Sequence, residues 1–173
     1  MQIETERLII RDLTAEDGYS FSAMAADGSL TDIGFDRDCG KWMAEWIVEA
    51  RELAARDRPD SAYLAYAVVL KDENIVVGSV GCSYYEDIRE IGITYFIGAQ
   101  YRNRGYAVEA IKAYAAYFFA HYRASRLIAT IRVENVSSWK TAEKAGFQLV
   151  EKKLYQDLND EQAEWYYFYE LTP

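Results

Sequence analysis

Apolar side chains recur at three- and four-residue intervals along several parts of the chain, and this spacing predicts helices. The stretch from Thr14 to Asp17 has the pattern of a capping box, so a first helix should begin near Ala15. Residues 40–57 have the spacing of a second, amphipathic helix. The pattern over residues 105–122 is apolar on most of its circumference, which predicts a helix buried against a sheet.

The remaining apolar runs have the character of strands. Residues 8–12 form a short one, and residues 63–85 contain two, separated by a polar turn at 72–74 that predicts an antiparallel hairpin. Further strands are predicted at residues 90–97, at 126–133 and as a closing pair from 147 to 172, while a short helix should end at Gly146. The predicted order is β-α-α-β-β-β-α-β-α-β-β, a mixed α/β sheet that is neither a barrel nor a doubly wound fold.

Composition and charge narrow the class of protein. The chain has 173 residues, is 51% hydrophobic and contains no Ser/Gly- or Pro-rich linker, so we expect one domain over residues 1–173. A net charge of −9 argues against a nucleic-acid-binding face and suits a cationic small molecule or a basic peptide as partner. The need for solubility explains the same charge equally well.

Metal, redox and membrane roles have little support in the sequence. Cys39 and Cys82 lie far apart and are expected to be two reduced thiols. His121 has no second histidine to form a zinc site, so no metal is expected. No apolar stretch reaches the roughly 18 residues that a membrane span requires. These features predict a soluble, cytoplasmic protein that binds neither membrane nor nucleic acid directly.

A basic turn precedes the third predicted helix in this acidic chain. Arg102, Asn103, Arg104 and Gly105 come directly before the helix, whose first amides are unpaired and carry a partial positive charge. Glycine lets the backbone approach a ligand, and arginines pair well with phosphate, so these residues suit a pyrophosphate. The alternative is an ordinary strand-to-helix turn with solvated arginines. The sequence here has neither the lysine of a P-loop nor the three glycines of a dinucleotide fingerprint.

Three segments resemble one family. Residues 102–107 resemble the R/Q-x-x-G-x-G/A acyl-CoA loop of the GNAT superfamily of N-acetyltransferases. Asn135 and Ser138, followed by E-K-A-G-F, resemble its second motif, and the opening E-T-E-R-L-I-I-R resembles the Rim branch, which acetylates ribosomal-protein N-termini. The resemblance implies a mostly antiparallel central sheet of about seven strands flanked by about four helices. It also implies acetyl transfer from acetyl-CoA, a cosubstrate, to a primary amine.

The resemblance further implies a set of cofactor contacts. The strand before the loop would offer its backbone to the pantetheine arm, the loop amides would hold the pyrophosphate, and the start of the following short helix would contact the pantetheine. Asn135 would serve equally well as a helix N-cap. The implied cofactor residues are Phe96, Ile97, Arg102, Asn103, Arg104, Gly105, Tyr106, Ala107, Asn135 and Ser138.

The catalytic groups are less clearly implied. Many family members carry a tyrosine seven residues after the motif asparagine, and it protonates the departing thiolate; this chain has Ala142 there. Ser138 or one of the other tyrosines would then be the acid. Glu90 stands where several members place the carboxylate that deprotonates the amine, although a solvated strand-end carboxylate explains it as well, and Glu86 and Asp87 are rivals.

The acceptor that fits these expectations best is the α-amine of a peptide or protein N-terminus, because it needs the weakest base. One alternative is a non-catalytic acyl-CoA-binding module, which Ala142 favours. The other is an acetyltransferase of a small cationic amine such as a polyamine or an aminoglycoside. A monomer and a homodimer both fit the sequence.

Overall fold

The computed structural model describes residues 1–157 and 160–173. Its strands and helices follow the predicted order, with one additional strand at the start. The strands are β1 (Gln2–Glu4), β2 (Leu8–Arg11), β3 (Tyr63–Leu70), β4 (Ile75–Tyr85), β5 (Glu90–Ile97), β6 (Leu127–Arg132), β7 (Gln148–Tyr155) and β8 (Glu164–Leu171). The α-helices are α1 (Asp17–Ala25), α2 (Met43–Arg56), α3 (Tyr106–Tyr122) and α4 (Val136–Ala145), and short 3-10 helices span Thr31–Ile33, Cys39–Lys41 and Ala99–Tyr101.

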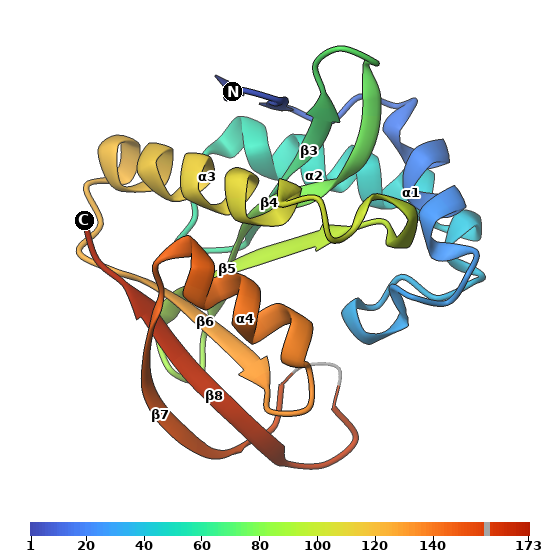
Figure 1. The fold of residues 1–173 in the computed structure, drawn as a ribbon. Helices are drawn as coiled ribbons and strands as arrows, with labels where there is room; N and C mark the ends of the chain where they lie inside the picture. The colour runs from blue at the N-terminus through green and yellow to red at the C-terminus, as the bar shows by residue number, and fades with distance from the viewer. Residues whose placement is uncertain (158–159) are drawn as a thin grey trace.

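The strands form one mixed sheet in the order β1-β2-β3-β4-β5-β6-β8-β7. All neighbours pair antiparallel except β5 and β6, which are parallel. Figure 1 shows α3 and α4 in front of the sheet, and α2 behind it. The mixed, mostly antiparallel α/β fold that the sequence predicted is therefore confirmed.

Two elements begin differently from the prediction. The sheet has eight described strands because Gln2–Glu4 pairs with β2, and three residues are too few to show a strand pattern. Helix α1 begins at Asp17, two residues after the predicted start near Ala15. The Asp17 carboxylate is 3% exposed and accepts hydrogen bonds from the Thr14 amide at 2.8 Å and from the Arg11 guanidinium at 2.7 Å. The bond from the Thr14 amide is one of the two bonds of the predicted capping box.

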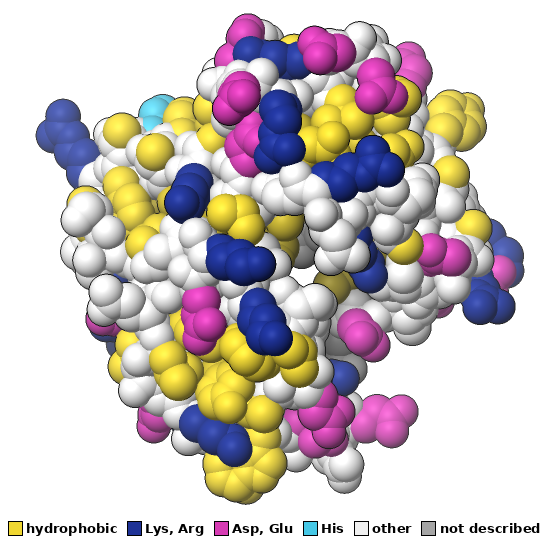
Figure 2. Space-filling model, viewed as in Figure 1, with side chains coloured by type: hydrophobic (Ala, Val, Ile, Leu, Met, Phe, Trp, Pro, Cys, Tyr) yellow, Lys and Arg dark blue, Asp and Glu magenta, His cyan; other side chains and the backbone are white. Residues whose placement is uncertain are grey.

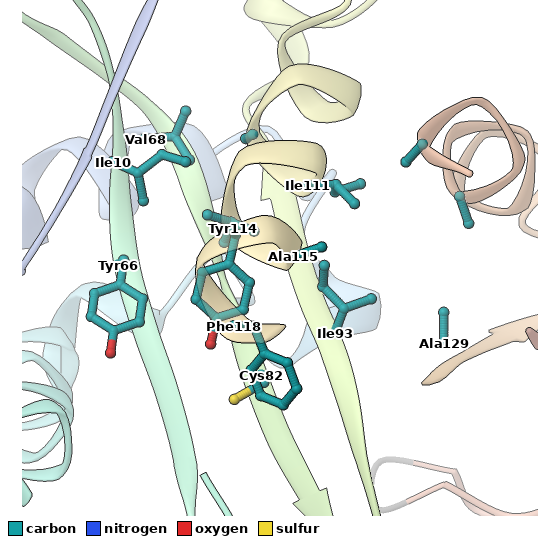
Figure 3. Close-up of a cluster of buried hydrophobic side chains, with 14 of the residues drawn as sticks. Ile10, Tyr66, Val68, Cys82, Ile93, Ile111, Tyr114, Ala115, Phe118 and Ala129 are labelled. Atoms are coloured by element: carbon teal, nitrogen blue, oxygen red, sulfur yellow. The ribbon is translucent and has the colours of Figure 1, made fainter. Parts of the chain in front are cut away.

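A hydrophobic core fills each face of the sheet. Helix α3 presents Ile111, Tyr114 and Phe118, each no more than 1% exposed, to β2, β3, β4 and β5. Figure 3 shows Tyr114 and Phe118 pointing from the helix toward the strands that carry Tyr66 and Cys82. Burying each of these side chains contributes about 1.5–3 kcal/mol, which explains why α3 lies against the sheet as predicted.

The second core lies under α1 and α2 and contains a cluster of aromatic rings. Phe21 of α1 and Phe35 each approach the Phe96 ring of β5 at 5.4 Å between centroids. Trp46 of α2 packs edge-on against Phe35 at 5.1 Å. The side chain of Phe96 thus belongs to this core, and its backbone pairs with Ser79 of β4.

Three further findings bear on redox, metal and membrane roles. Cys39 and Cys82 are both free and buried. Among residues 1–157 and 160–173, no group of three or more His, Cys, Asp or Glu side chains is arranged to hold a metal ion. No helix in this part of the chain has both the length and the apolar character needed to cross a membrane.

Candidate active site

The strands β5 and β6 diverge along their length. They share one registered pair, Gly92 with Ile128, whereas β5 stays paired with β4 from Glu90 to Ile97. Figure 1 shows β5 and β6 running apart toward their C-terminal ends. The β6-facing edge of β5 beyond Gly92 is therefore without a strand partner, and backbone groups there are available to an extended ligand. Of the two residues predicted to contact the pantetheine, Ile97 lies on this edge, whereas the Phe96 carbonyl faces Gly78 of β4.

The predicted phosphate loop lies between the C-terminal end of β5 and the start of α3. Asn103 has φ 61° and Gly105 has φ 82°, two left-handed residues that turn the chain into α3. The first α3 amide that donates to this turn is that of Glu109, to the Gly105 carbonyl at 3.1 Å. The preceding amides lie in the first turn of a helix, where they have no intrahelical partner. The loop thus combines unpaired donors with the positive end of a long helix, a combination that binds anions.

The two loop arginines have different surroundings. Arg102 donates from Nε to the Ile97 carbonyl at 2.9 Å and from its terminal nitrogen to the Ser29 carbonyl at 3.2 Å. These bonds tie the loop to β5 and to the turn after α1. Arg104 makes one long contact, 3.5 Å, with the Gln100 carbonyl, and is exposed. Arg104 is therefore the freer of the two charges to meet a phosphate.

The N-terminus of α4 carries the second predicted motif. Asn135 is the helix N-cap, and its side-chain oxygen accepts hydrogen bonds from the Ser138 amide and the Ser137 hydroxyl, both at 3.1 Å. Ala142, which occupies the family's tyrosine position, is fully buried in the core beneath α4. Gly146 ends the helix with φ 110°, as predicted.

A tyrosine that the sequence did not single out lies beside Ser138. The Tyr95 hydroxyl is 2.9 Å from the Ser138 hydroxyl and also donates to the Ser138 carbonyl at 3.0 Å. Burial raises the pKa of Tyr95 above its ordinary value of 10.0, and the bond with Ser138 opposes this only in part. Tyr95 therefore keeps its proton at neutral pH. The structure brings together two hydroxyl groups at the mouth of the diverging strands.

The predicted base lies elsewhere. Glu90 begins β5 and forms an ion pair with Arg126, whose Nε is 3.0 Å from the carboxylate. It is five residues from Tyr95, about 16 Å along an extended strand. Glu90 and Phe96 share the α1 and α2 face, whereas Tyr95 points to α4, so the structure does not bring Glu90 and Ser138 together. Of its rivals, Asp87 accepts a hydrogen bond from Tyr155 at 3.3 Å and Glu86 is exposed.

Basic side chains surround the candidate site although the chain has a negative net charge. Figure 2 shows Lys and Arg spread over the face formed by α3, its loop and α4. The exposed lysines of these helices are Lys112, Lys140 and Lys144. This distribution suits a ligand with several phosphate charges.

Comparison with known proteins agrees with this geometry. Residues 7–148 match the family described as acetyltransferase (GNAT) domain. The chain is 27% identical over 151 residues to the uncharacterized N-acetyltransferase YnaD of Bacillus subtilis (strain 168), covering 86% of this chain and 83% of YnaD.

Two solved structures share the fold. One is the microcin C7 self-immunity acetyltransferase MccE, in complex with acetyl-CoA and AMP, with 15% identity, a TM-score of 0.78 and coverage of 98% and 94%. The other is the ribosomal-protein-S5-alanine acetyltransferase from Vibrio fischeri, with 16% identity, a TM-score of 0.78 and coverage of 99% and 96%. The matched domain, which spans residues 7–148, shows that the chain belongs to the GNAT family and is an acetyl-CoA-dependent N-acetyltransferase.

Proposed function

We propose that the acetyl acceptor is the α-amine at the N-terminus of a peptide or protein. The observation that carries this proposal is the state of Glu90, whose carboxylate is occupied by Arg126 and stands away from the Tyr95 and Ser138 hydroxyls. A carboxylate that is bonded to a guanidinium and lies outside the site does not reach the acceptor amine directly. Such a site is matched to an amine that loses its proton easily.

The cost of deprotonation separates the two common protein amines. An α-amine has a pKa near 7.7–8.0 and a lysine side chain one near 10.4, so forming the neutral amine at pH 7 costs about 1 kcal/mol and about 4.6 kcal/mol respectively. The departure of CoA as a thiolate costs only about 2 kcal/mol at pH 7, because a thiol has a pKa near 8.5. The choice of amine therefore matters more to this site than the lack of a strong acid.

The cofactor contacts follow from the loop and the open edge of β5. We assign the pyrophosphate to the amides between Arg102 and Ala107, including those of Asn103, Gly105 and Tyr106, with Arg104 adding charge. The pantetheine would lie along the β6-facing edge of β5 near Ile97 and reach the start of α4, where Asn135 holds Ser138 in place. The lysines of α3 and α4 supply further positive charge on this face.

The chain's own groups then support direct transfer. Backbone amides on the open edge of β5 would stabilise the oxyanion that forms when the amine nitrogen attacks the acetyl carbonyl. As the carbon–sulfur bond breaks, the Ser138 hydroxyl would give its proton to the thiolate while accepting one from Tyr95, which is within hydrogen-bond distance, and Tyr95 would regain a proton from solvent. The amine proton leaves to solvent or, through water, to Glu90.

A small cationic amine is the second candidate. The exposed carboxylates of α2, among them Glu45, Glu49 and Glu52, would attract such a compound. A panel of N-terminally free peptides, N-blocked lysine peptides, polyamines and aminoglycosides, with mass-spectrometric readout and thiol release, separates the candidates. The proposal expects the free-N-terminus peptides to be modified fastest. Preferred acetylation of a polyamine or aminoglycoside would replace it with the second candidate.

A further inference from the structure

We propose that Arg7, which lies between β1 and β2 and far in sequence from the phosphate loop, is a positioning residue for acetyl-CoA. Its guanidinium holds the peptide between Arg104 and Gly105 in the orientation that presents the Gly105 amide to the pyrophosphate. This proposal rests on the proposed assignment of the loop. It adds a residue outside the family's loop motif and explains how a flexible turn is kept ready for its ligand.

The guanidinium of Arg7 joins three parts of the loop and helix. It donates to the Glu109 carboxylate from Nε at 2.7 Å and lies 2.6 Å from it through a terminal nitrogen. Its other terminal nitrogen donates to the Arg104 carbonyl at 2.8 Å. The guanidinium carbon lies 4.8 Å from the centre of the Tyr106 ring. A planar group held at three points has little freedom to turn.

The bond to Arg104 fixes the direction of an amide. In a trans peptide the C=O and the following N–H point to opposite sides, so the Gly105 N–H points away from Arg7. Glycine adopts positive and negative φ with similar ease, and the 104–105 peptide could flip without a partner. The bond from Arg7 to the Arg104 carbonyl favours the peptide orientation in which Gly105 has its observed φ of 82°.

Arg7 also removes an unfavourable charge. Glu109 lies in the first turn of α3, where it would repel a bound phosphate. Burial raises the pKa of Glu109, but hydrogen bonds from Thr5 and Arg7 outweigh this and bring the pKa below its ordinary value of 4.5. Glu109 is therefore ionised at neutral pH. Its charge is matched by Arg7 instead of opposing the ligand.

The segment that carries Arg7 is itself held firmly. The Thr5 amide donates to the Leu8 carbonyl, and the Leu8 amide donates to the Thr5 hydroxyl, both at 2.9 Å. The Thr5 carbonyl accepts from Lys71 at 2.6 Å, and the Thr5 hydroxyl donates to Glu109 at 2.6 Å. Arg7 thus connects the firmly held β1–β2 segment to the loop that precedes α3.

The experiment compares two forms of acyl donor. Arg7→Gln and Arg7→Lys should each weaken CoA binding, measured by calorimetry, about tenfold, which corresponds to about 1.4 kcal/mol. Lysine keeps the charge but cannot bond Glu109 and Arg104 together. With acetyl-pantetheine, which lacks the pyrophosphate, both variants should keep kcat/KM within about twofold of the wild type, because the chemical step is untouched.

Two controls distinguish a failure of this proposal from a failure of the loop assignment on which it rests. Arg58→Gln removes an exposed arginine that pairs with Asp60, and CoA affinity should not change. Gly105→Val tests the loop assignment: if it leaves CoA affinity intact, the loop is wrongly assigned. If Gly105→Val weakens binding but either Arg7 variant binds CoA normally, the role of Arg7 is overturned. An equal loss of kcat/KM with both donors would also overturn it, since that indicates general damage to the fold.

A double variant tests how Arg7 acts. If Arg7 served only to neutralise Glu109, then Arg7→Gln combined with Glu109→Gln would recover wild-type CoA affinity. Positioning of the 104–105 peptide predicts that the double variant stays about tenfold weaker. Full recovery would contradict the positioning role.

Discussion

Two hydroxyl groups, on a strand and on a helix, meet at the point where acetyl transfer is proposed. Ser138→Ala and Tyr95→Phe should each lower kcat about tenfold, the low end for general acids. The pKa of Tyr95 is raised, so its donor form persists as pH increases past the pKa of an α-amine. The wild-type rate should therefore rise to a plateau near pH 8–9 without falling again.

Steady-state kinetics between pH 6 and 9.5 check this prediction. Acetyl-CoA KM serves as the internal control for Tyr95→Phe only, because Ser138 is itself an implied contact of the cofactor. A Tyr95→Phe enzyme with wild-type kcat at every pH would show that the tyrosine only packs against α4.

Separate substitutions of Glu90 and of its ion-pair partner Arg126 test whether Glu90 acts as the base. If Glu90 accepts the amine proton, Glu90→Gln should lower kcat most at low pH, where the amine is protonated, and less as pH approaches 9. Arg126→Gln breaks the same ion pair but leaves the carboxylate in place. It should keep the wild-type pH profile or increase the rate at low pH. Matching losses in the two variants, without a change in pH profile, would show a structural ion pair and no base.

At the scale of elements, the turn into α3 makes the sharpest prediction. A valine at position 105 would have to keep a backbone φ near 82°, and its Cβ would lie 3.3 Å from the Arg7 guanidinium. We expect Gly105→Val to weaken CoA binding at least tenfold, about 1.4 kcal/mol.

Gly34 offers a matched control for this change. It has φ 88°, and a Cβ there would meet no atom within 4 Å, so Gly34→Val has similar backbone strain at a different site. Its CoA affinity should stay at the wild-type value. Equal affinities of the two folded variants would refute the assignment of the loop.

The elements themselves were predictable because each has a local signature. The apolar circumference of α3, the polar turn between β3 and β4, and Gly146 at the end of α4 all appear in short stretches of sequence. The start of α1 was predicted to within two residues, and the Thr14 amide donates to the Asp17 carboxylate, which is one of the two bonds of a capping box. Strand β1 was missed because its pairing with β2, not its own pattern, makes it a strand.

The candidate site was predictable only where its residues are neighbours in sequence. The loop before α3 and the cap of α4 are such segments. Tyr95 and Ser138 are 43 residues apart, and Arg7 and Glu109 are 102 apart. Contacts of this kind depend on how β5 and β6 diverge and on which end of α3 faces the sheet edge. No short motif records them.

At the scale of the molecule, a net charge of −9 accompanies a basic face around α3 and α4. The negative charge that remains elsewhere should attract a cationic acceptor over a distance set by the Debye length, about 8 Å at physiological salt. With acetyl-CoA saturating, acceptor KM should therefore rise with added salt. A preference for a neutral or anionic acceptor, or a KM independent of salt, would contradict this.

The identity of the acetylated nitrogen tests the central claim most directly. Two matched peptides carry the same basic sequence: one has a free N-terminus and an acetylated lysine, and the other a blocked N-terminus and a free lysine. Initial rates at pH 7 and the site of modification are measured by mass spectrometry. The proposed function predicts that the first peptide is acetylated on its α-amine and the second is a poor substrate. Faster acetylation of the free lysine would contradict it.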